Sequence, residues 1–166
     1  MSEALNDLMK LKYPEKEWKT FTHTPLLHQI PEVYTETINK NRFYVTPEGN
    51  KYPSITTVLS GRAKEGINAW RERVGESAAN RIMRAASSRG TAVHELAENY
   101  LNNEELKNQE VLPLFMFTQL KSELDNINNI VMQEGGLYSD NWGIAGRVDC
   151  IADYDGKLTV IDFKTS

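Results

Sequence analysis

The sequence predicts a single α+β domain, with helices in the middle of the chain and an antiparallel sheet towards its end. Between about residues 64 and 129, apolar side chains recur at the three- and four-residue spacing of helices. After residue 130, three segments rich in β-branched and aromatic residues follow, and Asp155-Gly156 joins the last two as a strong hairpin signal. A chain of 166 residues is long enough for one such domain and too short to expect two.

The first quarter of the chain predicts an arm and a hairpin. Residues 1–40 show little periodicity, and several prolines interrupt any long element, so we expect an extended N-terminal arm with short helical pieces. Residues 42–45 and 51–55 flank a Thr-Pro-Glu-Gly-Asn turn and predict a β-hairpin. Thr56 or Thr57 is expected to cap the helix that follows.

The helical region divides at two glycines. The pattern runs from residue 64 to about 101, and Gly75 and Gly90 are the expected interruptions. We therefore expect a helix over residues 90–102 and another over 111–129, flanking the sheet. The strands are predicted at three places, which are 130–138, 144–154 and 157–165.

The predicted hairpin brings charged residues together. If Asp155 and Gly156 form the centre of the turn, Asp149 lies directly opposite Asp162, and their side chains share one face of the sheet. Lys164 lies two residues beyond Asp162 and projects from the same face. The remaining side chains of this hairpin are apolar on both faces near these residues, which is typical of strands buried in the centre of a sheet.

Two opposed carboxylates in an apolar sheet predict a metal site. They would repel each other and lose hydration, and Mg²⁺ or Mn²⁺ bound between them would remove both penalties. Such an ion acidifies a bound water and stabilises charge on a phosphate, and Lys164 would orient or deprotonate that water. The alternative interpretation is an aspartate at a strand end and an ordinary surface lysine, each exposed to solvent.

The segment GRVDCIADYDGKLTVIDFKTS (146–166) resembles the catalytic hairpin of RecB-like PD-(D/E)XK exonucleases, phage enzymes among them. The resemblance implies a restriction-endonuclease-like core with a mixed β-sheet, in which the catalytic hairpin is flanked by helices. It implies that Asp149 and Asp162 bind the metal and that Lys164 is the catalytic lysine. The implied function is metal-dependent hydrolysis of DNA phosphodiester bonds, acting on single-stranded ends.

Two outlying motifs extend the resemblance to residues 42–166. The run RGTAVHELAE places the family's helical histidine on His94, which implies a metal ligand or a contact to the phosphate and the metal-bound water. The family's acid on the preceding strand falls on Glu134, which is otherwise an ordinary acid near a strand end. Glu98 lies one helical turn after His94, where it either orients the imidazole or faces solvent.

Charge is distributed unevenly along the chain. The net charge is −4, yet residues 61–90 carry seven basic against three acidic side chains. A local basic patch on an acidic body suits a protein that binds phosphates at one place and cations at another. Arg73, Arg81, Arg84 and Arg89 are the candidate DNA contacts, and a solvated helix face is the alternative.

Composition excludes several classes of protein. No apolar stretch has the length of a membrane span, and the N-terminus has neither a signal nor a transit peptide pattern. Cys150 is the one cysteine, which excludes an intrachain disulfide and a cysteine zinc cluster. We expect a cytoplasmic protein with DNA as its partner, without a membrane partner or a small-molecule cofactor.

The resemblance divides the chain into an N-terminal arm (1–40) and a nuclease core (41–166). Related nucleases continue past the Lys-Thr-Ser run into a helix with a Gln-x-x-x-Tyr motif, so the core is expected to be C-terminally truncated. Two other functions stay open. A non-catalytic nucleic-acid-binding module would lack those elements, and a sequence-specific endonuclease would need a recognition region.

Overall fold

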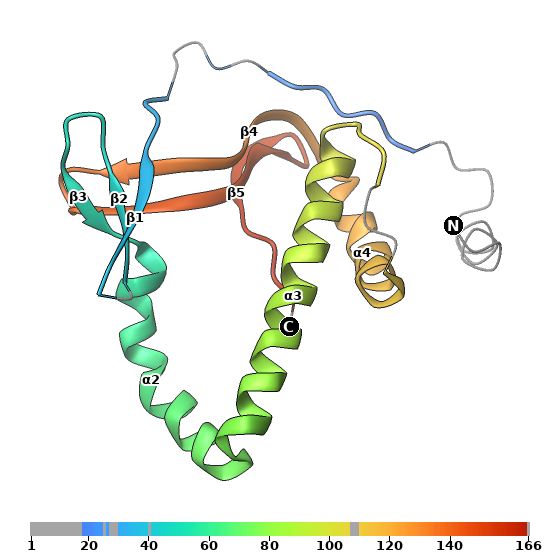
Figure 1. Cartoon of the computed structure of the whole chain (residues 1–166). Helices are drawn as coiled ribbons and strands as arrows, with labels where there is room; N and C mark the ends of the chain where they lie inside the picture. Colours follow the sequence, from blue (N-terminus) through green and yellow to red (C-terminus); the bar gives the residue numbers. More distant parts are fainter. Residues whose placement is uncertain (1–17, 25, 27–29, 40, 107–109, 166) are drawn as a thin grey trace.

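The structure is a computed structural model that describes residues 18–24, 26, 30–39, 41–106 and 110–165 (Figure 1). Within these ranges it contains three helices and six strands, which confirms the predicted α+β class. In chain order the elements are β1 (Tyr34–Ile38), β2 (Asn41–Val45), β3 (Lys51–Pro53), α2 (Ile55–Val74), α3 (Glu76–Leu101), α4 (Val111–Leu124), β4 (Ile127–Ser139), β5 (Ile144–Tyr154) and β6 (Lys157–Ile161). No helix in the described part is long and apolar enough to cross a membrane.

The strands form two antiparallel sheets, β1-β2-β3 and β4-β5-β6. The predicted mixed sheet is therefore wrong for the described strands, where parallel pairing is limited to the isolated bridges His23–Ile130 and Ser54–Ala145. The physical reason is the connections: each sheet is built from consecutive strands joined by a few residues, and such short links allow antiparallel pairing alone.

The first sheet confirms the predicted hairpin, with Phe43 opposite Pro53 in β2 and β3. β1 also pairs with β2, so this part of the predicted arm is a strand. The first 17 residues of that arm lie outside the described residues. The cap of α2 is Ser54, not Thr56 or Thr57, because the Ser54 hydroxyl accepts a hydrogen bond from the Thr57 N–H at 3.0 Å.

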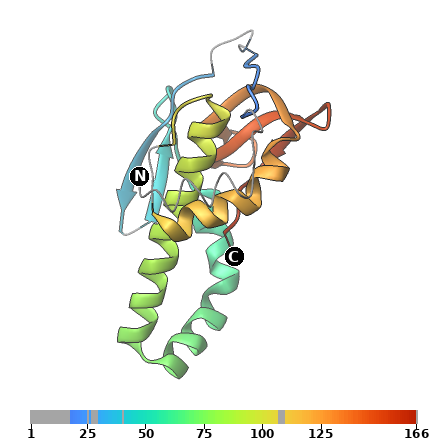
Figure 2. The same ribbon diagram turned by 90° about the vertical axis from the view of Figure 1, so that its right-hand side faces the viewer.

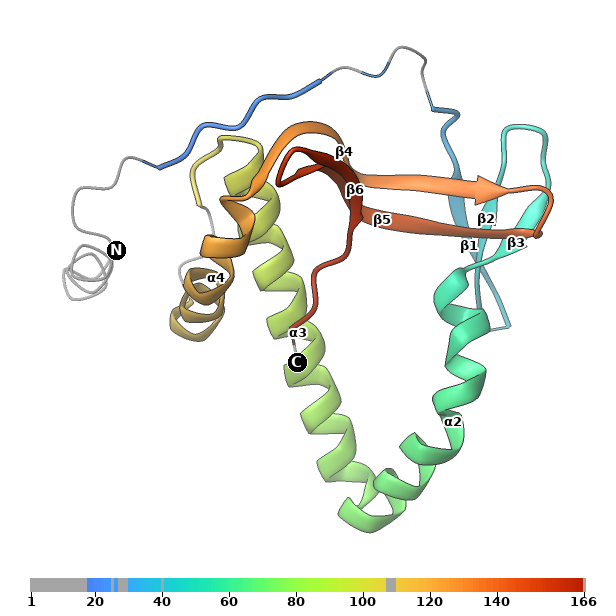
Figure 3. The ribbon, with the colours of Figure 1, turned by 180° about the vertical axis from the view of Figure 1, so that it is seen from behind.

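The helices α2 and α3 meet in a V, and their far ends reach opposite ends of the long β4–β5 ribbon (Figures 1 and 3). Gly75 separates them as predicted, and its φ of +84° lies in the region that favours glycine. Gly90 does not interrupt α3, so the predicted start of a helix at residue 90 is wrong. A single glycine costs a helix only about 1 kcal/mol relative to alanine. The glycine lets the end of the chain approach, because a Cβ there would lie 3.2 Å from the Thr165 hydroxyl.

The helix α4 packs beside α3 (Figure 2), and its buried residues share one hydrophobic core with β4 and β5. It ends at Leu124, so the prediction of helix to residue 129 is wrong. Three asparagines after the helix disfavour helical structure, and the two isoleucines among them are buried in β4. The largest fully buried side chains of the core are Phe117, Leu96, Leu101, Leu124, Ile127, Ile130, Val93 and Cys150. This core fixes α3 against β4 and β5, which carry the candidate site.

Candidate metal centre

The turn between β5 and β6 has the predicted register. Asp155 and Gly156 have φ values of +50° and +77°, as a two-residue hairpin turn with both central residues left-handed requires. Tyr154 lies opposite Lys157, as predicted from these two residues.

The predicted pair of Asp149 and Asp162 is the next step of this register but is not part of the ladder. The ladder ends where Cys150 lies opposite Ile161, so Asp162 comes after the last pair and its side chain is 61% exposed. The chain leaves the sheet there because Phe163 packs into the core, where its residue is 6% exposed. The Phe163 N–H donates to Asp149 Oδ2 at 2.6 Å, so Asp149 holds the backbone of the departing segment.

On the other side of β5, an acid of β4 faces Asp149. Gln133 lies opposite Cys150, and Gly135 lies opposite Val148, which leaves Glu134 at the position corresponding to Asp149. The backbone is distorted here, since Glu134 has a φ of +49°. The sequence signal for this distortion is the Glu-Gly-Gly run, because glycines inside a strand mark irregular backbone or close packing.

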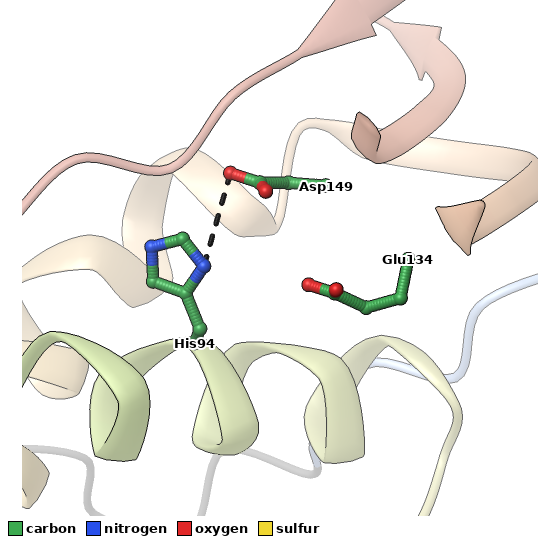
Figure 4. A group of neighbouring side chains, drawn as sticks. All are labelled: His94, Glu134 and Asp149. Carbon is green, nitrogen blue, oxygen red and sulfur yellow. Dashed lines mark ion pairs between the residues drawn. The ribbon is translucent and has the colours of Figure 1, made fainter. Parts of the chain in front are cut away.

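Three of the candidate site residues meet at α3 (Figure 4). One ligand atom each from His94, Glu134 and Asp149 lies within 4.8 Å of the others. His94 Nδ1 is 3.8 Å from Asp149 Oδ2, and the imidazole packs edge-on against the Phe163 ring. All three residues are half-buried. α3, β4 and β5 thus contribute one donor each to a single cluster.

The donor set fits a divalent cation. Two carboxylates and one imidazole supply the hard oxygen ligands that Mg²⁺ and Mn²⁺ prefer, with a nitrogen that Mn²⁺ also accepts. Burial raises the pKa of the Glu134 carboxyl, the charges of Asp149 and Glu98 raise it further, and the Arg147 guanidinium opposes them. The cluster therefore concentrates negative charge where solvation is poor, and a cation would relieve that cost.

Replacing Glu134 by glutamine tests this electrostatic cost. Folding raises the pKa of the Glu134 carboxyl, so the ionised carboxylate destabilises the folded protein at pH values above the folded-state pKa. This destabilisation disappears at pH values below the unfolded-state pKa of about 4.3, because the carboxyl is then protonated in both states. Glu134→Gln is expected to raise the melting temperature of the metal-free protein at pH 7 but not below about pH 4. We also expect Mn²⁺ binding, followed by calorimetry, to weaken at least about tenfold. An equal rise in melting temperature at both pH values would contradict the charge effect.

Comparison with known proteins finds similarity to exonucleases. No family model matches the chain. The human mitochondrial genome maintenance exonuclease 1 is 26% identical over 128 residues, which cover 70% of this chain and 37% of that protein. The mouse protein of the same name is 28% identical over 127 residues, covering 70% of this chain and 38% of its own. The chain is a distant homologue of mitochondrial genome maintenance exonuclease 1. It spans less than two fifths of the length of these curated relatives.

Asp162 and Lys164 lie outside the three-residue cluster of this exonuclease homologue. Their side chains form an ion pair with each other and are 61% and 73% exposed. They flank Phe163, the residue whose backbone N–H donates to Asp149 Oδ2. The structure thus brings together His94, Glu134 and Asp149 of the predicted site, while Asp162 and Lys164 lie outside this cluster.

A pocket of about 420 Å³ opens next to the cluster. Glu98, one turn after His94, lines it together with Glu134 and the small residues Gly90 and Thr91. Glu95, which the sequence patterns did not single out, lines it as well. The pocket leaves room for metal-bound waters or a phosphate group beside the carboxylates.

The candidate DNA-binding arginines are spread over the V of α2 and α3. Arg81 and Arg84 share a pocket of about 660 Å³, and both are exposed. Arg84 precedes His94 by ten residues of helix, or about 15 Å. Arg73 is exposed on α2, and Arg89 is half-buried about 140° around α3 from His94. Arg81 and Arg84, three residues apart on α3, are therefore the pair that line one pocket.

Proposed function

We propose that this chain is a divalent-metal-dependent deoxyribonuclease that degrades DNA from single-stranded ends. The observation that carries the proposal is the convergence of His94, Glu134 and Asp149 in a distant homologue of an exonuclease. We propose a PD-(D/E)XK, restriction-endonuclease-like core over residues 41–166, preceded by an arm over residues 1–40.

The proposed chemistry assigns a role to each side chain. Bound Mg²⁺ or Mn²⁺ would supply an acidified water and charge stabilisation at the scissile phosphate. His94, Glu134 and Asp149 hold the ion, and Asp162 contributes a further carboxylate from the adjoining segment. Lys164 orients or deprotonates the attacking water, in keeping with its place two residues beyond Asp162.

Phosphate contacts away from the metal centre are proposed for Arg73, Arg81, Arg84 and Arg89. Arg81 and Arg84 are supported by their shared pocket, which their guanidinium groups make suitable for a phosphate. At about 15 Å from His94 along the helix, Arg84 would contact DNA several nucleotides from the scissile bond.

Degradation of end-labelled DNA with Mn²⁺ and with EDTA tests the proposal. We expect Mn²⁺-dependent shortening of linear single-stranded DNA, slower digestion of blunt duplex, and no cutting of circular single strands. An Asp149→Asn preparation purified in parallel controls for contaminating nucleases.

Each alternative gives a different result. A sequence-specific endonuclease would produce discrete fragments from duplex DNA and cut circles that contain its site. The exposure of Asp162 and Lys164 favours the second alternative, a binding module without turnover. Such a module would retain single strands in a binding assay and cleave none of the substrates.

A further inference from the structure

Arg147 lies at the edge of the candidate metal centre. Its Nη1 is 3.4 Å from Glu134 Oε2, and its side chain is 62% exposed against 28% for Glu134. Arg147 precedes Asp149 by two residues in β5 and lies opposite Gly136, two residues beyond Glu134 in β4. Because alternate residues of a strand share a face, Arg147 projects from the same face as the two carboxylates.

The distance between Arg147 Nη1 and Glu134 Oε2 is long for a strong ion pair. Strong charge-assisted hydrogen bonds between nitrogen and oxygen are about 2.7–2.9 Å long, and the guanidinium group carries about five N–H donors in a planar fork. Among the residues that the structure describes, Glu134 is the ion-pair partner of Arg147, and a single Nη1 contact joins them. Most of the fork therefore faces solvent beside the cluster.

Charge balance indicates which kind of group the Arg147 guanidinium binds. A divalent cation held by Glu134 and Asp149 would neutralise both carboxylates, which would leave the positive charge of Arg147 without a counter-charge. An anionic group arriving at the same cation would supply that counter-charge. The planar fork also matches the oxygens of a phosphate in a bidentate arrangement.

We propose that Arg147 is a substrate-binding residue that contacts a DNA phosphate at the metal centre. This inference rests on the proposed nuclease function. In the metal-free protein, Glu134 holds the guanidinium group beside the site. With a cation held by Glu134, the same guanidinium group would be available to donate to the phosphate.

Steady-state cleavage by Arg147→Met over a salt series, with saturating Mn²⁺, tests this role. We expect the KM for single-stranded DNA to rise about tenfold. The slope of log kcat/KM against log salt should become shallower by about 0.7, which is the share of one phosphate neutralised on a single strand. Arg147→Lys keeps the charge but not the fork, so its KM should lie between those of the other two proteins.

Mn²⁺ binding without DNA separates this role from a purely structural one. We expect calorimetry to give the same Mn²⁺ affinity for Arg147→Met and wild type within about twofold. An unchanged salt slope overturns the proposal, and if Mn²⁺ affinity falls at the same time, Arg147 acts by positioning Glu134. Arg42→Met, an exposed arginine of β2, is the matched control and should change neither quantity. If wild type and Asp149→Asn cleave equally, the nuclease function itself fails, which is a distinct result.

Discussion

Asp149→Asn is expected to lower kcat/KM for DNA cleavage by about 1000-fold or more, which corresponds to roughly 4 kcal/mol of transition-state stabilisation. Asp149 is the residue through which the centre is assembled: it is 3.8 Å from His94, lies across from Glu134, and accepts the Phe163 N–H. Removing its charge would take away a proposed metal ligand. Calorimetry should therefore show Mn²⁺ binding at least about 100-fold weaker.

Asparagine is the informative replacement because it preserves the fold. Its side-chain oxygen can still accept the Phe163 N–H, so the melting temperature should stay close to that of wild type. Asp149→Ala would leave this part-buried N–H without its acceptor, at a cost of about 1–3 kcal/mol.

Asp153→Asn is the matched control for Asp149→Asn. Asp153 lies on the same strand and accepts a hydrogen bond from Asn129, outside the metal cluster. We expect this variant to cleave DNA like wild type. Equal reductions of activity in the two variants would show that β5 tolerates no change, and would remove the support for a metal ligand at Asp149.

Lys164→Ala is expected to lower kcat by about 100- to 10,000-fold while Mn²⁺ affinity stays unchanged, because the lysine is proposed to act on the attacking water and not on the ion. Its side chain is 73% exposed and pairs with Asp162, so its removal should not affect the core. Single-turnover cleavage with saturating DNA measures the chemical step, and calorimetry measures the metal.

Lys157→Ala is the control for the removal of a lysine. Lys157 begins β6 and is likewise exposed, at the end of the strand away from the metal centre. Its replacement should leave kcat unchanged. If Lys164→Ala retains full activity, the catalytic lysine is elsewhere, and the Lys-Thr-Ser run no longer supports the resemblance to the nuclease hairpin.

Much of the second sheet could be predicted because it depends on neighbouring residues. Asp155 and Gly156 adopt the left-handed conformation of a tight turn at little cost, and this conformation sets the register of β5 and β6 up to Ile161. Gly75 likewise marked the corner between α2 and α3. In each case the decisive energies are local backbone preferences, which sequence patterns record directly.

The continuation of α3 through Gly90 could not be predicted in this way. The glycine cost is small and the helix is long, so packing of the helix outweighs the local preference. The reason for a glycine appears only in the folded chain, where Thr165 lies against that turn of the helix.

Asp149 and His94 could be recognised as candidate ligands without a structure, since a strand register and a helical motif identify them. The folded chain was needed to show that Glu134 of β4 lies across from Asp149 and that the β5–β6 ladder stops before Asp162. The ladder predicted from the turn continues only while pairing is more favourable than other contacts. Burial of Phe163 draws the chain out of the sheet at that point, and β4 brings its own acid to face Asp149. Both events depend on contacts between residues far apart in the sequence, which no local pattern contains.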